Sequence, residues 1–346
     1  MSHRTVSRSL AQAGILTLAC WAATVSGAHR AHAEESLADN ISAQVRKVFD
    51  ERKNAVVKVR AGDKLGIRFG SGFFADPTGT VYTHAGIVMK ADDVTVMTSD
   101  GKEMPARVLI ADERSGIAIL KVDACTPSIP LGNSKNVTMA TPVLLIGYPE
   151  DREASPSFGI VGGLDRKYLG QFFSTTHIRA NLAVQRGQGG APVLDLNGEA
   201  IGILVGRIDG GSGCHVLPIR AAEKVRMDLA RFGELRPGWV GVEVEDAPEA
   251  VSGSTAKVDK LDPDTPAAQS GLQVGDILLS VGGTRISTVE DLIDASYFLT
   301  AGDSADIEVM RGTERLSLPV RPALHPLAQG RDMQATADAL QRFHLE

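Results

Sequence analysis

The stretch Gln185-Arg186-Gly187-Gln188-Gly189-Gly190-Ala191-Pro192-Val193 places three glycines within four residues, directly before a short apolar segment that ends at Leu194. Glycine adopts backbone conformations that other residues avoid, so a turn of this composition can aim neighbouring backbone N–H groups into one small space. A space of that kind can hold a carbonyl oxygen or a carboxylate. The stretch therefore predicts a tight turn that leads into a strand and is able to bind such a group.

Short strands are expected on both sides of this turn. Segments rich in β-branched residues alternate with Gly, Asp, Asn and Pro, and they cover 56–59, 67–74, 94–96, 107–110, 117–122, 143–146, 191–194 and 200–205. Strands at this spacing without long helices between them predict an all-β barrel or sandwich that runs to about residue 220. Apolar periodicity predicts one helix before the strands, at Leu37–Phe49, and another after them, at Arg220–Phe232.

A second unit follows the second helix. The segment 233–238 is typical of a linker, and the unit of under 90 residues beyond it mixes strands with two helices. We expect a signal peptide at 1–33, a first domain at 37–232, a second domain at 233–323, and a C-terminal tail at 324–346. The tail is polar and carries a possible short helix, which is typical of a loosely docked chain end.

Composition agrees with two folded domains. The chain has 346 residues, of which 43% are hydrophobic and 23% are charged, enough to bury a sizeable core. The net charge of −6 and the pI near 5.8 provide no basic footprint of the kind that phosphate backbones require. Nucleic acid is therefore not an expected partner. No CxxC motif or His/Cys cluster points to a metal site.

The N-terminus has the features of a secretory signal. Arg4 and Arg8 precede an apolar stretch at 11–27, and Ala31-His32-Ala33 then provides a cleavage site. Cleavage after Ala33 would remove three arginines and no acidic residue, changing the net charge from −6 to −9. A retained membrane anchor, or a lipid anchor at Cys20, is the alternative. We expect export, with a periplasmic or other extracytoplasmic location.

Two cysteines remain after such a cleavage, Cys125 and Cys214. An oxidising compartment permits a disulfide between them, but sequence spacing does not reveal how far apart they lie in space. One disulfide and two separate thiols therefore both remain open.

Four segments, taken in order, resemble the HtrA (Deg) family of secreted trypsin-fold proteases, in which a protease domain precedes a PDZ domain. They are Gly70–Phe74, Val81–Val88, Asp112–Lys121 and Gln185–Val193. Together with the second unit, the resemblance covers residues 37 to about 322. It implies a mainly β fold, with a trypsin-like double β-barrel domain followed by one α+β PDZ domain, and it implies no cofactor.

The resemblance also locates the positions of the catalytic triad. Gly86 stands at the histidine position, Gly116 at the aspartate position and Gly189 at the serine position. Loss of all three groups costs about 2 × 10⁶ in kcat in subtilisin, and what remains comes from the oxyanion hole and binding. We therefore expect a pseudoprotease that keeps a vestigial oxyanion loop at Gly187, Gln188 and Gly189, and whose barrel is a scaffold for binding or assembly.

Two alternatives remain at this stage. One is an active serine endopeptidase with a relocated site, for which His84, two residues before the expected histidine, is the candidate base, with Ser71 and Ser115 nearby. The other is a structural subunit that assembles with an active relative. His177 and His215 lie on strand-like segments and are expected to be structural.

The stretch Pro263–Gly283 closely resembles the centre of bacterial PDZ domains, with Gly271 ending a helix and Gly275-Asp276 starting a tight turn. The resemblance implies that partner C-termini are captured by a carboxylate-binding loop, extended along the following strand, and closed in by a helix at Val289–Leu299. The expected peptide-binding residues are Gly238, Trp239, Val240, Gly241 and Val242 of the loop, with Leu292 and Ser296 of the helix. The family resemblance further suggests a homotrimer, and the overall expectation is a scaffold, chaperone-like or regulatory factor in protein quality control.

Overall fold

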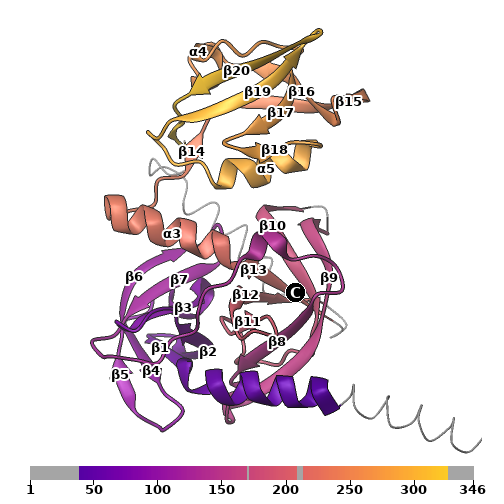
Figure 1. Ribbon diagram of the computed structural model, residues 1–346. Helices are drawn as coiled ribbons and strands as arrows, with labels where there is room; N and C mark the ends of the chain where they lie inside the picture. The colour runs from indigo at the N-terminus through magenta and orange to yellow at the C-terminus, as the bar shows by residue number, and fades with distance from the viewer. Residues whose placement is uncertain (1–38, 170, 209–212, 326–346) are drawn as a thin grey trace, which may run out of the picture. The chain divides into compact units, whose positions relative to one another are not determined.

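The computed structural model describes residues 39–169, 171–208 and 213–325 (Figure 1). The chain divides into two units after Asp50. A helix covers residues 39–52, in place of the helix predicted at 37–49. The predicted signal peptide and nearly all of the predicted tail lie outside the described residues.

A seven-stranded antiparallel sheet forms the first half of the β domain, with strand order β5-β4-β1-β2-β3-β7-β6. The strands β1 and β2 make a tight hairpin, in which Val56 is opposite Phe73 and Asp63 is opposite Gly66. Val59, Val81 and Leu120 belong to its core and are fully buried. The strands are β1 (Val56–Asp63), β2 (Gly66–Phe74), β3 (Thr80–His84), β4 (Asp93–Met97), β5 (Glu103–Pro105), β6 (Arg107–Asp112) and β7 (Ile117–Lys121), with short helices η1 (Lys53–Ala55) and α2 (Ala85–Val88).

The second half is a closed six-stranded barrel with strand order β10-β13-β12-β11-β8-β9. Its core holds Leu145, Val193 and Val216, all fully buried. Its elements are η2 (Ser134–Asn136), β8 (Pro142–Gly147), η3 (Pro149–Asp151), β9 (Ser155–Tyr168), β10 (Gln171–Asn181), β11 (Pro192–Leu194), β12 (Ala200–Arg207) and β13 (Cys214–Pro218). The helix α3 (Ile219–Phe232) follows directly and ends at Gly233, whose φ of 74° suits a left-handed cap.

The C-terminal domain combines a five-strand path, β15-β16-β17-β19-β20, with two helices; β18 pairs with β17 and β14 with β21. Thr265 caps α4 by accepting from the Ala268 N–H, and Asp291 Oδ2 accepts from the Thr288 N–H at the start of α5. The elements are β14 (Gly238–Trp239), β15 (Val242–Val251), β16 (Ser254–Leu261), α4 (Pro266–Gln269), β17 (Ile277–Val281), β18 (Thr284–Arg285), α5 (Val289–Tyr297), β19 (Ala305–Arg311), β20 (Glu314–Val320) and β21 (Ala323–Leu324).

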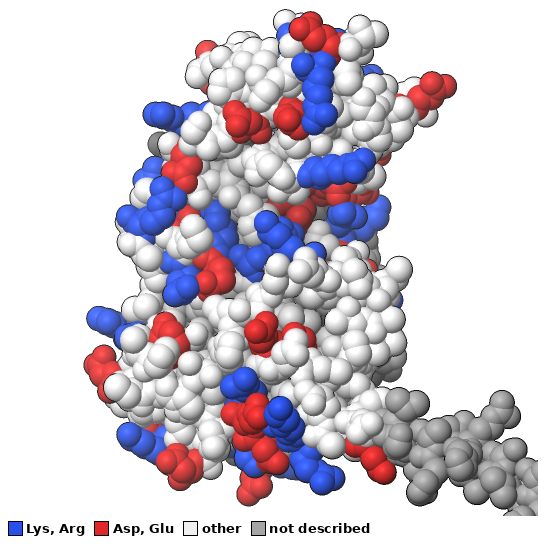
Figure 2. Space-filling model, in the orientation of Figure 1, with Lys and Arg blue, Asp and Glu red and all other residues white. Residues whose placement is uncertain are grey.

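The mainly β architecture predicted from the sequence is confirmed, and each predicted strand corresponds to a strand of the structure. The two longest strands, β9 and β10, were not among the predicted ranges, although the segment of His177, in β10, was interpreted as strand-like. Both lie in the closed barrel, where they pair with each other. On the face shown in Figure 2, positive and negative side chains are interspersed over the described residues.

Candidate functional site

The glycine-rich turn at 185–190 has a backbone that requires glycine at two of its positions. Gly187 and Gly190 have φ of +88° and +84°, in the left-handed region that other residues rarely adopt. A Cβ atom on Gly190 would lie 2.3 Å from the Ser71 carbonyl oxygen, so close packing also disfavours any side chain at this position. Sequence reasoning had predicted the turn, and the structure shows that it is tightly built.

Ser71 supports this turn through hydrogen bonds. Its Oγ donates a hydrogen bond of 2.8 Å to the Gly187 carbonyl and accepts one of 2.9 Å from the Tyr148 N–H. Its backbone N–H donates to the Gly189 carbonyl at 2.8 Å. Ser71 itself is fully buried. The hydroxyl that sequence reasoning considered as a relocated nucleophile therefore has a structural role, and its signal in the sequence was only its place in a Gly-Ser-Gly strand.

The Gln188 side chain stabilises the turn by a hydrogen bond to its backbone. Its side chain is 1% exposed, and its Oε1 accepts a hydrogen bond of 2.8 Å from the Gln185 N–H. Within the described residues, neither the Gly187 nor the Gly189 N–H donates to a protein acceptor. The side chains of Gln188 and Ser71 thus hold the backbone of the turn in place.

The structure places Gly86 and Gly116, at the histidine and aspartate positions, next to His84, the last residue of β3. A Cβ atom on Gly86 would lie 2.9 Å from His84 Cε1, and one on Gly116 would lie 3.4 Å from His84 Nε2. Gly189 adjoins Gly190, whose Cβ position is 2.7 Å from the His84 backbone nitrogen. The His84 imidazole therefore lies between the positions at which the family resemblance expects the histidine and the aspartate.

Gly116 and Gly189 differ in what they would tolerate. Gly116 has a φ of +78°, so an aspartate there would be strained by about 1–2 kcal/mol. Gly189 has no such conformation, and a Cβ atom there would meet no atom within 4 Å. A serine side chain fits at the serine position, whereas the aspartate position now has a backbone suited to glycine.

Ser115, the other hydroxyl near His84 in sequence, is also committed elsewhere. It is 3% exposed and donates a hydrogen bond of 2.6 Å to Asp112 Oδ2. The Asp112 carboxylate also accepts from the Arg114 N–H, so the pair belongs to the turn between β6 and β7. This arrangement shapes the loop and provides no activated nucleophile.

His177 and His215 lie together in the closed barrel, each 5% exposed. The His177 ring stacks on Phe173 with 4.2 Å between centroids, and its Nδ1 is 2.8 Å from the Thr175 carbonyl oxygen. Burial lowers the pKa of His177 to about 4 and also lowers the pKa of His215, whose Nε2 is 3.4 Å from Asp165 Oδ2. Among the described residues there is no group of three or more His, Cys, Asp or Glu arranged to hold a metal ion.

The two cysteines are separate thiols, which decides between the two possibilities that the sequence left open. Cys125 is exposed and Cys214 is buried, and neither forms a disulfide. Burial raises the pKa of the Cys214 thiol to about 12. Cys214 therefore behaves as a small apolar residue of the barrel core.

The predicted carboxylate-binding loop of the C-terminal domain leads into β15. Val240 is buried and its carbonyl accepts a 2.9 Å hydrogen bond from the Ala267 N–H. Gly241 has a φ of +74°, and a Cβ atom there would lie 2.5 Å from Thr265 Cγ2 and 2.9 Å from Trp239 Cη2. The loop is thus closely packed beneath a half-buried Trp239, and only glycine fits at position 241.

The strand and helix beside this loop supply the remaining predicted residues. In the sheet, β15 is an edge strand that pairs only with β16, so its second side carries unpaired backbone groups. Leu292 of α5 is 7% exposed and packs in the core with Val240, while Ser296 is half-buried. An extended peptide can add to an edge of this kind as a further strand.

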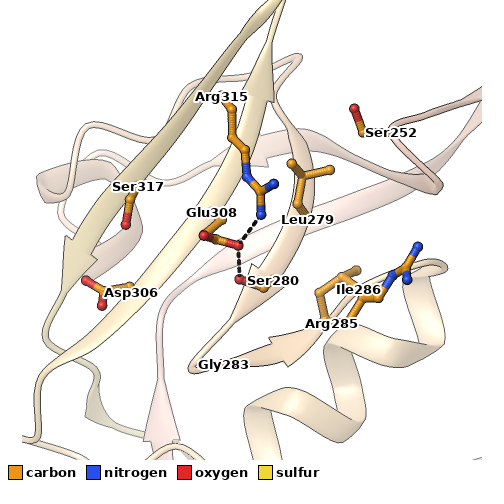
Figure 3. A pocket seen from close by; sticks show the side chains of 10 residues that line it. All are labelled: Ser252, Leu279, Ser280, Gly283, Arg285, Ile286, Asp306, Glu308, Arg315 and Ser317. Atoms are coloured by element: carbon orange, nitrogen blue, oxygen red, sulfur yellow. Dashed lines mark hydrogen bonds and ion pairs between the residues drawn. The ribbon is translucent and has the colours of Figure 1, made fainter.

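A separate hollow of about 570 Å³ lies in the same domain and is lined by residues of β17, β18, β19 and β20 (Figure 3). Arg315 and Ser280 both donate to Glu308 Oε2, at 2.9 and 2.8 Å, and Leu279 and Ile286 add apolar side chains to the lining. None of the predicted peptide-binding residues lines this hollow. The sequence contained no motif that would have pointed to it.

Comparison with known proteins agrees with this architecture. Residues 70–203 match the trypsin-like peptidase domain family, and residues 238–321 match the PDZ domain family. A probable periplasmic serine endoprotease, DegP-like, from Pseudomonas fulva is 33% identical over 282 residues, which are 78% of this chain and 58% of the relative. A protein of the same description from Brucella suis is 27% identical and covers 84% of this chain. The chain belongs to the HtrA/Deg family.

Solved structures of the HtrA/Deg type have the same fold. The HtrA-type protease AlgW with a tripeptide superposes with a TM-score of 0.69 at 24% identity, covering 82% of this chain and 97% of that chain. A serine endoprotease from Yersinia pestis has a TM-score of 0.60 at 23% identity. The chain spans 58% of the Pseudomonas fulva relative and 59% of the Brucella suis relative. Across the described ranges, the structure contains no helix long and apolar enough to span a membrane.

Proposed function

We propose that this HtrA/Deg protein is an exported pseudoprotease, which binds peptide or protein segments without cleaving them and captures C-termini through its PDZ domain. One observation carries the proposal: glycine stands at all three triad positions around a turn that is otherwise rigidly built. The relatives described as periplasmic, and the signal-like segment that ends at Ala33, support export.

The absent side chains account for the expected lack of cleavage. Hydrolysis by this fold needs a hydroxyl to attack, an imidazole to take its proton and a carboxylate to orient that imidazole. Glycine supplies none of these groups, and the neighbouring hydroxyls of Ser71 and Ser115 are bound to other partners. The remaining N–H groups of the turn can hold a carbonyl oxygen but cannot break its bond.

Binding rests on features that are intact. The Gly187 and Gly189 N–H groups can receive a peptide oxygen in the barrel domain, and the edge strand β15 can receive an extended C-terminus in the PDZ domain. Such a protein would act as a scaffold, chaperone-like or regulatory factor, as a homotrimer or in assembly with an active relative. No cofactor is needed for any of these roles.

A cleavage assay tests the proposal, and the structure determines which variant should accompany it. Restoring a histidine at 86 requires removal of the His84 ring, and position 116 should stay glycine because of its backbone. We therefore compare the native chain from Glu34 with the His84→Asn, Gly86→His, Gly189→Ser variant on an unfolded protein substrate. The matched control carries His84→Asn, Gly86→His and Gly189→Ala, which lacks only the hydroxyl.

The native chain and the control should be silent, and the restored variant should cut. Its rate should exceed the control by roughly 10²-fold, because a serine and histidine without the aspartate recover only part of the activity of a triad. Cleavage by the native chain that a serine-directed inhibitor stops would refute the pseudoprotease and establish an active endopeptidase. Binding is measured in parallel with peptides that end in a free carboxylate or in an amide, and only the carboxylate form should bind to the PDZ domain.

A further inference from the structure

The edge strand β15 has two chemically different faces. Val242 and Val244 are half-buried and pack against the domain core, which includes Leu292 of α5. Between and beyond them, Glu243 and Glu245 are exposed, with side chains 63% and 49% accessible. The strand therefore presents apolar side chains toward the helix and carboxylates on the opposite face of the sheet.

The alternation of β15 determines how a bound peptide would be oriented. Residues directly opposite each other on antiparallel strands direct their side chains to the same face of the sheet. With its carboxylate held by the loop that ends at Gly241, the last residue of a peptide lies opposite Val242 and directs its side chain to the same face, where Val242 and Val244 pack with Leu292 of α5. The last residue but one and the last but three then face outward, opposite Glu243 and Glu245.

The regular part of β15 is long enough for these positions and ends soon after them. Its ladder with β16 pairs Glu243 with Lys260 and Val244 with Val258, so the register shift between them adds one residue to β16 and leaves β15 without an extra residue. The ladder then continues to Asp246, and the next shift comes before Val251. Pro248 follows in the shifted segment and has no N–H to donate. A peptide can therefore pair with 242–246, which spans its last five residues or so.

Each of the two outward carboxylates pairs with a lysine of the neighbouring strand. Glu243 forms an ion pair of 3.0 Å with Lys260, and Glu245 pairs with Lys257, both on β16. The other side of each carboxylate faces the open edge of the sheet, where the peptide strand would lie. The peptide side chain would be about 5 Å from the glutamate Cβ and roughly one strand further from the lysine, so the glutamate dominates the local field.

We infer that the PDZ groove selects C-termini with Lys or Arg at the last-but-one and last-but-three positions, and disfavours Asp or Glu there. The selection arises because three side chains lie side by side on adjacent strands: a cation of the peptide, a glutamate of β15 and a lysine of β16. The inference rests on the proposed binding of C-termini to this groove and adds the chemical class of the ligand.

The test uses the full chain from Glu34 and labelled peptides that share a C-terminal valine. Alanine, lysine or glutamate occupies both outward positions, and an amidated copy of the lysine peptide is included. Fluorescence anisotropy should show the lysine peptide binding about two- to thirtyfold more tightly than the alanine peptide at low salt, as expected for two favourable cross-strand pairs. The glutamate peptide should bind more weakly than alanine, and high salt should compress the differences.

Two charge-reversed variants provide the decisive comparison. Glu243→Lys with Glu245→Lys should reverse the preference, so that the glutamate peptide binds best. Asp306→Lys with Glu314→Lys changes the net charge equally but lies on β19 and β20, away from β15, and should retain the preference for lysine. Carboxylate-dependent binding with equal affinity for all three peptides would overturn this inference alone. Absent binding, or equal binding of the amidated peptide, would instead overturn the proposed capture of C-termini.

Discussion

Alanine substitution should strongly destabilise the chain at Gly190 and leave its stability almost unchanged at the adjacent Gly189. At Gly190 the new Cβ would lie 2.3 Å from the Ser71 carbonyl oxygen and 2.7 Å from the His84 backbone nitrogen, in a residue with φ of +84°. The left-handed conformation costs about 1–2 kcal/mol for alanine, and displacing packed backbone costs about 1–3 kcal/mol more. The free energy of unfolding should therefore fall by roughly 2–5 kcal/mol.

The same methyl group at Gly189 would meet no atom within 4 Å, and its backbone is not left-handed. Its effect should stay within about 0.5 kcal/mol of the native value. Thermal unfolding of the chain from Glu34, followed by calorimetry and by circular dichroism, measures both. For a domain of this size the Gly190→Ala variant should melt about 4–20 °C lower, at roughly 2–4 °C for each kcal/mol. Equal melting temperatures of the two variants would refute the packing described for the turn.

Three further predictions concern buried or exposed groups elsewhere. Burial lowers the pKa of His177 from 6.5 to about 4, so as the pH falls the unfolded chain takes up a proton at this residue before the folded chain does. The contribution of His177 to the free energy of unfolding is therefore complete above pH 6.5, and stability decreases by up to about 3 kcal/mol as the pH falls toward 4. His177→Gln should make the melting temperature depend less on pH between 6.5 and 4. The same pH dependence in the variant and the native chain would contradict this role of His177. Of the two thiols in the chain from Glu34, only the exposed Cys125 should react with a thiol reagent under native conditions. Cys214 should react only after denaturation. Rapid modification of the native Cys125→Ser variant would show instead that Cys214 is accessible. Asp276 is 1% exposed and accepts hydrogen bonds from the Arg311 guanidinium at 2.7 and 2.8 Å and from the Gln273 N–H. Asp276→Asn should therefore lower the free energy of unfolding of the PDZ domain by about 1–3 kcal/mol, as measured by urea titration. A change below about 0.5 kcal/mol would contradict this role.

The strand β9 shows where local pattern fails to predict structure. Gly159, Gly162 and Gly163 interrupt β9, and glycine is depleted in strands, so the composition did not favour one. In the structure these glycines allow close approach of the partner strand: a Cβ on Gly159 would lie 2.1 Å from the Asn181 carbonyl oxygen, and one on Gly163 would lie 2.4 Å from the Arg179 guanidinium. The reason for the glycines is a tertiary contact, which a window of neighbouring residues does not contain.

The sequence by itself determined the fold class, the order of the two domains, the glycine-rich turn and the presence of glycine at 86, 116 and 189. These follow from residue type and short-range spacing, which control backbone preference and the face of a strand on which a side chain lies. It also contained the alternation of valine and glutamate along β15, although not the edge position that makes it available to a ligand.

Only the tertiary structure decided what surrounds these residues. Ser71 supports Gly187 across 116 residues of chain, and His84 lies between the Cβ positions of Gly86 and Gly116. The left-handed backbone of Gly116 and the separation of the two cysteines also became visible only in the folded chain. The physical reason is the same in each case: such contacts join segments far apart in sequence, and they are decided by how strands and loops pack rather than by the local preference of either segment.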